Sequence, residues 1–364
     1  MKRALIVLAV IALVASAGDM ISGGSDLTKF TGYGTFRWTS YGIEGANPEN
    51  QFSDFIWMAW LPKINDSVDF CFSAAHTTTS SDINIDFDQM YLNMKVTDCL
   101  SLRGGQFKVP FGYAYTRSGG SMLFADRSFM LVSTEDPDPD SPPGTMINDF
   151  FTYGGRDIGA MLTVEFAPVT VDLMLSNGTG NNAAADTSIN KQFTARLAVE
   201  PTEWLTIGGS MAMIGQPEMG DDESVSSNGM DFFAVANYPV TPTGTLNFVG
   251  EYMMLDVPVN DIEGVELHNG ARMSVMAGYD MQLDGDVIMA IQPAVRYDSV
   301  DPITGWEEEG GEEPEDNLSA IDFCVGIDLF SNLNTLQIGA RNYGFENSDI
   351  DGYTDIYANW RMNF

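Results

Sequence analysis

The chain has 364 residues, of which 51 are Asp or Glu and only 17 are Lys or Arg, so its formal net charge at pH 7 is -34. A charge of this sign excludes nucleic acid as a partner, because phosphate groups repel an acidic surface. Three cysteines, Cys71, Cys99 and Cys324, are widely spaced. Their spacing predicts neither a disulfide framework nor a metal site.

The first 17 residues have the pattern of a secretory signal peptide. Lys2 and Arg3 precede an apolar run at 4–15, and Ala15-Ser16-Ala17 is a small-x-small cleavage site. A single membrane-spanning anchor is the alternative, but this run is too short to cross ~30 Å of hydrocarbon as a helix. Removal of the signal takes away Lys2 and Arg3 and changes the formal charge from -34 to -36. Residues 18–27 are then a short N-terminal segment, and residues 28–364 form the domain.

The domain alternates apolar and polar residues with a period of two, which is typical of strands. No later apolar run approaches ~18 residues, so only a closed barrel could place this chain in a membrane. The pattern predicts sixteen strands, near 28–41, 50–61, 66–79, 83–96, 99–109, 154–166, 169–177, 191–200, 203–214, 229–239, 244–257, 268–283, 286–299, 318–330, 333–345 and 353–364.

The connections between these strands alternate in length. Turns such as those at 97–98, 167–168 and 331–332 have two residues, whereas the intervening connections are long, acidic and rich in Gly and Pro. A soluble β-sandwich also alternates along its strands, but it does not sort its loops by end. We therefore predict an all-β fold, a sixteen-stranded transmembrane antiparallel β-barrel of the bacterial outer membrane.

The last strand carries an apolar row that includes Trp360, Met362 and the terminal Phe364. We expect this row to face lipid while the strand closes the barrel against the first one. A terminal Phe on such a row resembles the signal read by the bacterial barrel-assembly machinery, although Asn359 stands where that signal often has glycine. An ordinary final strand is the alternative interpretation.

Sixteen strands leave a water-filled lumen, so a selective channel needs something that narrows it. The longest connection, residues 110–153 after the fifth strand, is predicted to be a third loop folded into the pore. A loop that stays outside the barrel is the alternative.

The segment that leads into this loop contains LSLRGGQFK at 100–108 and a Pro-Phe-Gly turn, followed by a Phe-x-x-Arg-Ser stretch at 124–128. This stretch of about thirty residues resembles the phosphate-selective porin O and P family. The residues that carry the resemblance are Gly105, Gln106, Phe107, Lys108, Pro110, Phe111 and Gly112. The resemblance implies a sixteen-stranded, usually trimeric channel with an inward third loop.

Selectivity depends on the charges that face the lumen. Strand parity turns arginines inward and the third loop adds two more, a set comprising Arg37, Arg103, Arg117, Arg127, Arg196, Arg272, Arg296, Arg341 and Arg361. Acidic residues share the lumen or the constriction, among them Asp126, Glu165 and Glu251, and lysines are few. We predict a weakly selective porin for passive diffusion of small hydrophilic solutes or ions. A phosphate- or anion-selective channel and a structural or adhesive barrel remain alternatives.

Catalysis and cofactors are not expected. The two histidines, His76 and His268, lack a nucleophile motif, so we predict no enzyme activity. Acidic runs at 136–140, 221–223 and 307–315 could bind Ca²⁺ weakly or bridge to lipopolysaccharide through divalent ions, although solvated loop tips are the alternative. The partners expected are outer-membrane lipid, lipopolysaccharide, the barrel-assembly machinery and two further copies of the chain.

Overall fold

A computed structural model describes residues 28–42, 50–78, 83–126, 154–178, 191–215, 226–261, 264–304, 317–330, 333–346 and 352–364. The predicted signal peptide, residues 18–27 and the three acidic runs lie outside these ranges. Within them, no helix combines the length and the apolar character needed to cross a membrane.

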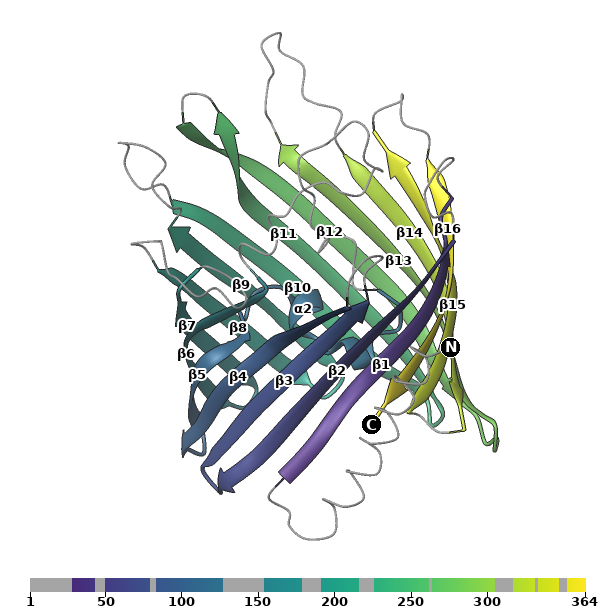
Figure 1. Ribbon diagram of the computed structural model, residues 1–364, viewed down its shortest axis with the longest axis horizontal. Coiled ribbons are helices and arrows are strands. Elements are labelled where there is room, and N and C mark those ends of the chain that lie inside the picture. Colours follow the sequence, from purple (N-terminus) through teal and green to yellow (C-terminus); the bar gives the residue numbers. More distant parts are fainter. Residues whose placement is uncertain are drawn as a thin grey trace.

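The strand prediction is confirmed, because sixteen antiparallel strands close into one barrel (Figure 1). The strands are β1 (Thr28–Ser40), β2 (Asn50–Asn65), β3 (Val68–Thr78), β4 (Ile83–Thr97), β5 (Leu100–Lys108), β6 (Arg156–Phe166), β7 (Val169–Ser176), β8 (Gln192–Thr202), β9 (Leu205–Gly215), β10 (Ser226–Thr241), β11 (Gly244–Asp261), β12 (Gly264–Gln282), β13 (Ile288–Thr304), β14 (Leu318–Leu329), β15 (Asn334–Phe345) and β16 (Tyr353–Asn363).

The barrel closes where β1 pairs with β16, the first and last strands in Figure 1. Gly32 and Phe364 exchange two backbone hydrogen bonds of 3.0 Å, so the terminal residue takes part in the seam. A Cβ added at Gly32 would lie 2.6 Å from the Phe364 ring. Glycine at position 32 therefore lets the terminal aromatic ring lie across the first strand.

Apolar side chains face outward and polar side chains face the lumen. On β14, Ile321, Phe323 and Val325 are exposed, whereas the alternate residues Asp322 and Cys324 are buried. A row of exposed apolar side chains is what a lipid-facing surface requires. The period of two separates the two faces of each strand, and the closed barrel turns the apolar face outward.

The short connections between β4 and β5 and between β6 and β7 lie within one residue of their predicted places, and the turn predicted at 331–332 lies outside the described residues. β2 and β3 are joined at Asp66 and Ser67, β4 and β5 at Asp98 and Cys99, and β6 and β7 at Ala167 and Pro168. The interiors of most of the long connections lie outside the described residues.

The chain turns into the barrel after β5. The described part, residues 109–126, includes the short helices α2 (Tyr113–Thr116) and η1 (Gly119–Ser121). Figure 1 shows α2 enclosed by the strands. We call residues 110–126 the inward segment. The rest of the predicted third loop, residues 127–153, lies outside the described ranges.

Candidate functional site: the lumen and its inward segment

The motif after strand β5 builds the turn into the lumen. Gly105 has a φ of 130° and Gly112 a φ of 74°, both in the region that favours glycine. A Cβ at Gly105 would also lie 2.8 Å from the Cα of Tyr91 on β4. The two glycines therefore allow the close approach of β5 to β4 and the reversal that starts α2.

Other residues of the motif hold the turn in place. Lys108 donates from Nζ to the carbonyl oxygens of Tyr115 at 3.0 Å and Arg117 at 3.1 Å, at the end of α2. Phe107 and Phe111 are fully buried. The physical role of this motif is thus to direct the chain inward and to anchor the first turn of the segment.

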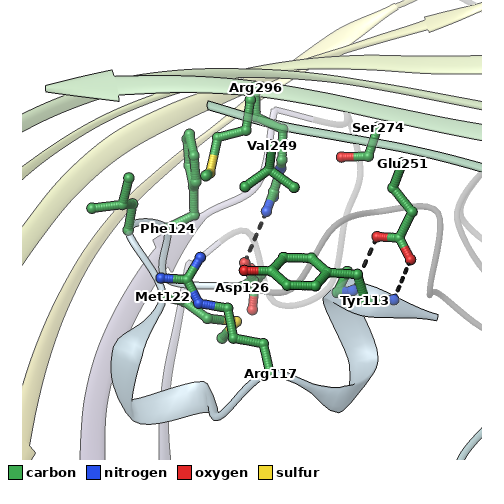
Figure 2. Close-up of a pocket in the computed structure, with 12 residues that line it drawn as sticks. Tyr113, Arg117, Met122, Phe124, Asp126, Val249, Glu251, Ser274 and Arg296 are labelled. Atoms are coloured by element: carbon green, nitrogen blue, oxygen red, sulfur yellow. Dashed lines mark hydrogen bonds between the residues drawn. The ribbon is translucent and has the colours of Figure 1, made fainter. Parts of the chain in front are cut away.

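Glu251 attaches the start of the inward segment to β11. Its carboxylate accepts hydrogen bonds from the backbone N–H of Tyr113 at 2.6 Å and of Ala114 at 3.0 Å (Figure 2). The residue is 3% exposed. Ser210 on β9 accepts a further bond from the backbone N–H of Gly112 at 3.3 Å. The beginning of the segment is therefore bound to the β9–β11 wall.

Asp126 attaches the other end of the described segment. Its carboxylate lies 2.6 Å from Nη1 of Arg37 on β1 and 3.6 Å from Nη2 of Arg341 on β15. Arg296 on β13 donates to its backbone carbonyl at 3.1 Å. Enclosure by the barrel would raise the pKa of the Asp126 carboxyl, but the nearby arginines, Arg37 first, outweigh this effect and hold the pKa below its usual 3.8.

Backbone carbonyls between these two ends accept bonds from the wall. Gln337 on β15 donates to the carbonyl of Leu123 at 2.8 Å, and Arg361 on β16 donates to that of Met122. The Phe124 ring is 1% exposed and lies 4.5 Å from the Arg296 guanidinium carbon. The middle of the segment is thus bound to β13, β15 and β16.

Four of the arginines predicted to face the lumen contact the inward segment. Arg37, Arg296, Arg341 and Arg361 bind the inward segment. Asp322 on β14 also accepts from Arg296 at 3.0 Å and from Arg341 at 2.8 Å. The charges of Arg37, Arg296 and Arg341 are neutralised by Asp126 and Asp322, whereas Arg361 donates to the Met122 carbonyl and to Thr335.

The remaining predicted residues lie in several places. Arg272 on β12 is 2% exposed, and Arg117 donates to the carbonyl of Ser121 at 2.7 Å within the segment itself. Glu165 lies near the short-turn end, with Lys63 and Lys95. Arg127 lies outside the described residues. Their role in the pore stays a prediction.

An open space remains on the opposite side of the lumen, between the inward segment and the β1–β8 wall. We call it the passage; its volume is about 890 Å³. Its lining consists of Tyr33, Trp57, Asp88, Gln89, Arg103, Lys108, Pro110, Thr116, Ser118, Gly119, Arg156, Met161, Asp172 and Arg196. Four basic side chains thus face two acidic ones, in a chain whose overall charge is strongly negative.

The basic residues of the passage differ in how far they are neutralised. Arg156 lies 2.5 Å from Asp88, and Arg196 lies 3.7 Å from Asp172. The Arg103 guanidinium lies over the Tyr91 ring at 4.4 Å, and no described carboxylate is within ion-pair distance of it. Arg103 also lines a second space toward the short-turn end, where Lys29, Lys63 and Lys95 meet four acidic residues.

Sequence reasoning missed several of these residues. Parity places Arg156 with the outward row of Ile158, yet its guanidinium reaches Asp88 and the phenol of Tyr115 at 2.8 Å. Sequence reasoning also missed Asp88, the 5% exposed carboxylate that pairs with Arg156. Arg156 follows the third loop directly, and this position was the signal that could have identified it.

Metal binding receives no support from the described ranges, in which no group of three or more His, Cys, Asp or Glu side chains is placed to hold an ion. His76 pairs with Asp54 at 3.5 Å between β2 and β3.

A closed sixteen-stranded barrel with a lipid-facing exterior, a charged lumen and an inward segment defines a porin, a passive channel of the bacterial outer membrane. The sequence model described as phosphate-selective porin O and P matches residues 63–230, just under half of the chain. This match includes the motif at 105–112 and confirms the resemblance to that family.

Solved structures share the fold at low identity. The outer membrane channel DcaP of Acinetobacter baumannii has 9% identity and a TM-score of 0.61, over 93% of this chain and 97% of that one. An anion-selective porin from Comamonas acidovorans has 10% identity and a TM-score of 0.56, over 93% and 99%. OmpT of Vibrio cholerae, in a trimer form, has 11% identity and a TM-score of 0.54, over 93% and 100%. A comparison with curated proteins finds no match.

Proposed function

We propose that small hydrophilic solutes cross this porin through the passage on the β1–β8 side, and that the third loop forms the constriction. The support is geometric. Residues 112–126 are bound to inward side chains of β9, β11, β13, β15, β16 and β1 and so occupy the other side of the lumen. A smaller space of about 450 Å³ remains on that side, beside Phe124 and Glu251 (Figure 2). The passage is the larger of these two spaces.

We further propose that the passage prefers anions. The observation that carries this proposal is the local balance of four basic against two acidic side chains, with Arg103 free of a described carboxylate. Charges close to a narrow path act on a permeating ion more strongly than charges beyond a Debye length of about 8 Å. The acidic loops therefore affect entry, while the passage decides the preference.

The assembly proposed is a homotrimer in outer-membrane lipid, contacting lipopolysaccharide and inserted by the barrel-assembly machinery. The trimer is supported by the named OmpT structure, a trimer form of that protein with the same fold. The exposed row at the end of β16, with Trp360 48% and Phe364 37% exposed, supports recognition during assembly. We propose transport without a catalytic step, as the family match and the fold both indicate a channel.

The test is the reversal potential of the purified protein in a planar bilayer under a KCl gradient. We expect an anion preference that the Arg103→Gln variant shifts toward cations. The matched control is Lys191→Gln, which removes an exposed charge near Asn177 outside the passage lining. A cation preference in the unaltered protein would refute the anion proposal. If added phosphate blocked the KCl current, the proposed anion preference would include phosphate.

A further inference from the structure

Aromatic rings line the inner wall of the first two strands. The Tyr33 ring centroid lies 5.5 Å from that of Phe55 and 6.0 Å from that of Trp57. These residues alternate with outward residues such as Phe36, Phe52 and Trp60, which are exposed on the lipid side. A porin lumen is normally polar, so an aromatic row that faces inward is an exception to the pattern.

The row belongs to the passage. Tyr33 and Trp57 both line the same space as the basic side chains of β5, β6 and β8. Trp57 donates from Nε1 to the Asp88 carboxylate at 2.6 Å, which fixes the edge of the indole and orients its face. A Cβ at Gly119 would lie 2.8 Å from Cζ of Tyr33, so the inward segment places only glycine against that ring.

A cation lines the same space as the rings. Arg103 comes from β5, and its guanidinium is held over Tyr91 at 4.4 Å and Phe107 at 5.5 Å. The stacking positions the charge without neutralising it. One space of about 890 Å³ therefore combines a flat apolar surface with a cation that no described carboxylate neutralises.

We propose that the passage favours small organic anions that carry a planar apolar group, such as aromatic carboxylates, over aliphatic or inorganic anions of the same charge. The carboxylate interacts with Arg103, and the ring packs against Trp57 and Tyr33. Aromatic pairs prefer offset or edge-to-face contacts, which a tilted row offers to a passing ring. This inference rests on the proposed function, because it concerns the same passage.

The experiment compares benzoate with acetate as blockers of the KCl current through single channels in a planar bilayer. We expect benzoate to reduce the current at concentrations roughly two- to tenfold lower than acetate, the factor that one aromatic contact supplies. Trp57→Ala and Tyr33→Leu should each remove most of this difference. Trp57→Phe keeps a ring in place and should retain it.

The matched control is Trp60→Ala, an outward tryptophan on the same strand that is 42% exposed. It should leave the ratio of benzoate to acetate block unchanged. Heat-modifiable migration on a gel checks that each variant forms a barrel. If Trp57→Ala does not fold, the ratio of benzoate to acetate block is measured in Tyr33→Leu instead.

The outcomes are separable. Equal block by benzoate and acetate in a conducting channel overturns this inference and leaves the proposed function intact. A benzoate preference that survives both Trp57→Ala and Tyr33→Leu also overturns it. A protein that forms no channels removes the proposed function and this inference together.

Discussion

Arg37 on the first strand and Asp126 at the far end of the inward segment form an ion pair of 2.6 Å. Arg37 also donates to the neighbouring carbonyl of Ala125, 88 positions along the sequence, at 2.7 Å. The inward segment is therefore attached to the barrel on the β1 side as well as on the β11 side. Its two attachments can be tested separately.

The Glu251→Gln variant should loosen the attachment at β11. A glutamine has one acceptor oxygen in place of two, so the backbone N–H of Tyr113 or Ala114 loses its acceptor, which costs about 1–3 kcal/mol for a buried group. We expect higher current noise and a higher mean single-channel conductance. Asp284→Asn is the control, because Asp284 is an exposed residue of the β12–β13 turn and lines neither the passage nor the second space. Conductance equal to that of the unaltered protein would show that this attachment does not control the passage.

Acid should loosen the attachment at β1. Because the pKa of Asp126 is lowered in the folded protein, the ion pairs contribute above the ordinary value of 3.8 and are lost as the pH falls through the lower folded value. The single-channel conductance should therefore show a transition with its midpoint below pH 3.8. In Asp126→Asn this acidic transition should disappear. A transition of unchanged midpoint in that variant would assign it to another group.

Phe124→Ala should destabilise the barrel by about 3–5 kcal/mol, because it removes a fully buried ring and leaves a cavity beside Arg296. The free energy of unfolding in urea, followed by tryptophan fluorescence, measures the change. Phe166→Ala, which truncates a side chain that is 58% exposed on the outer surface, should cost much less. Equal costs would mean that the packing of the inward segment adds little stability.

Gly105→Ala should prevent correct formation of the turn after β5. The backbone there has a φ of 130°, and an added Cβ would collide with the backbone of Met90 and Tyr91. Gly104→Ala is a matched control on the adjacent residue, where an added Cβ meets nothing within 4 Å. We expect a low yield of folded barrel for the first variant and a normal yield for the second, measured by heat-modifiable migration.

The sequence predicted the strands well, because a period of two is a local property. The pattern of β14 and β16 and the short turns were sufficient to predict the barrel and its closure. The roles of the arginines could not be predicted in the same way. Parity turns Arg341 inward, but only the three-dimensional fold brings it to Asp322 and Asp126. The passage also depends on where residues 112–126 lie, and that is decided by contacts across the whole lumen.

The inward aromatics were missed for a related reason. Tyr33 and Trp57 alternate with equally large outward residues, so hydrophobicity alone does not distinguish the two faces of β1 and β2. Their significance appears only when the inward segment and Arg103 are placed around the same space.

The off-centre position of the passage divides the wall into two parts with different tolerance to change. Substitutions on the inner faces of β9–β16 would alter the contacts that hold the inward segment. A compensating change in the segment could restore those contacts. Side chains of the β1–β8 half that line the passage without a described bond to the segment, such as Arg103, would meet the solute directly and have no such partner. A preference for a different solute could thus arise from a few changes on one half of the barrel, while the other half continues to hold the same inward segment.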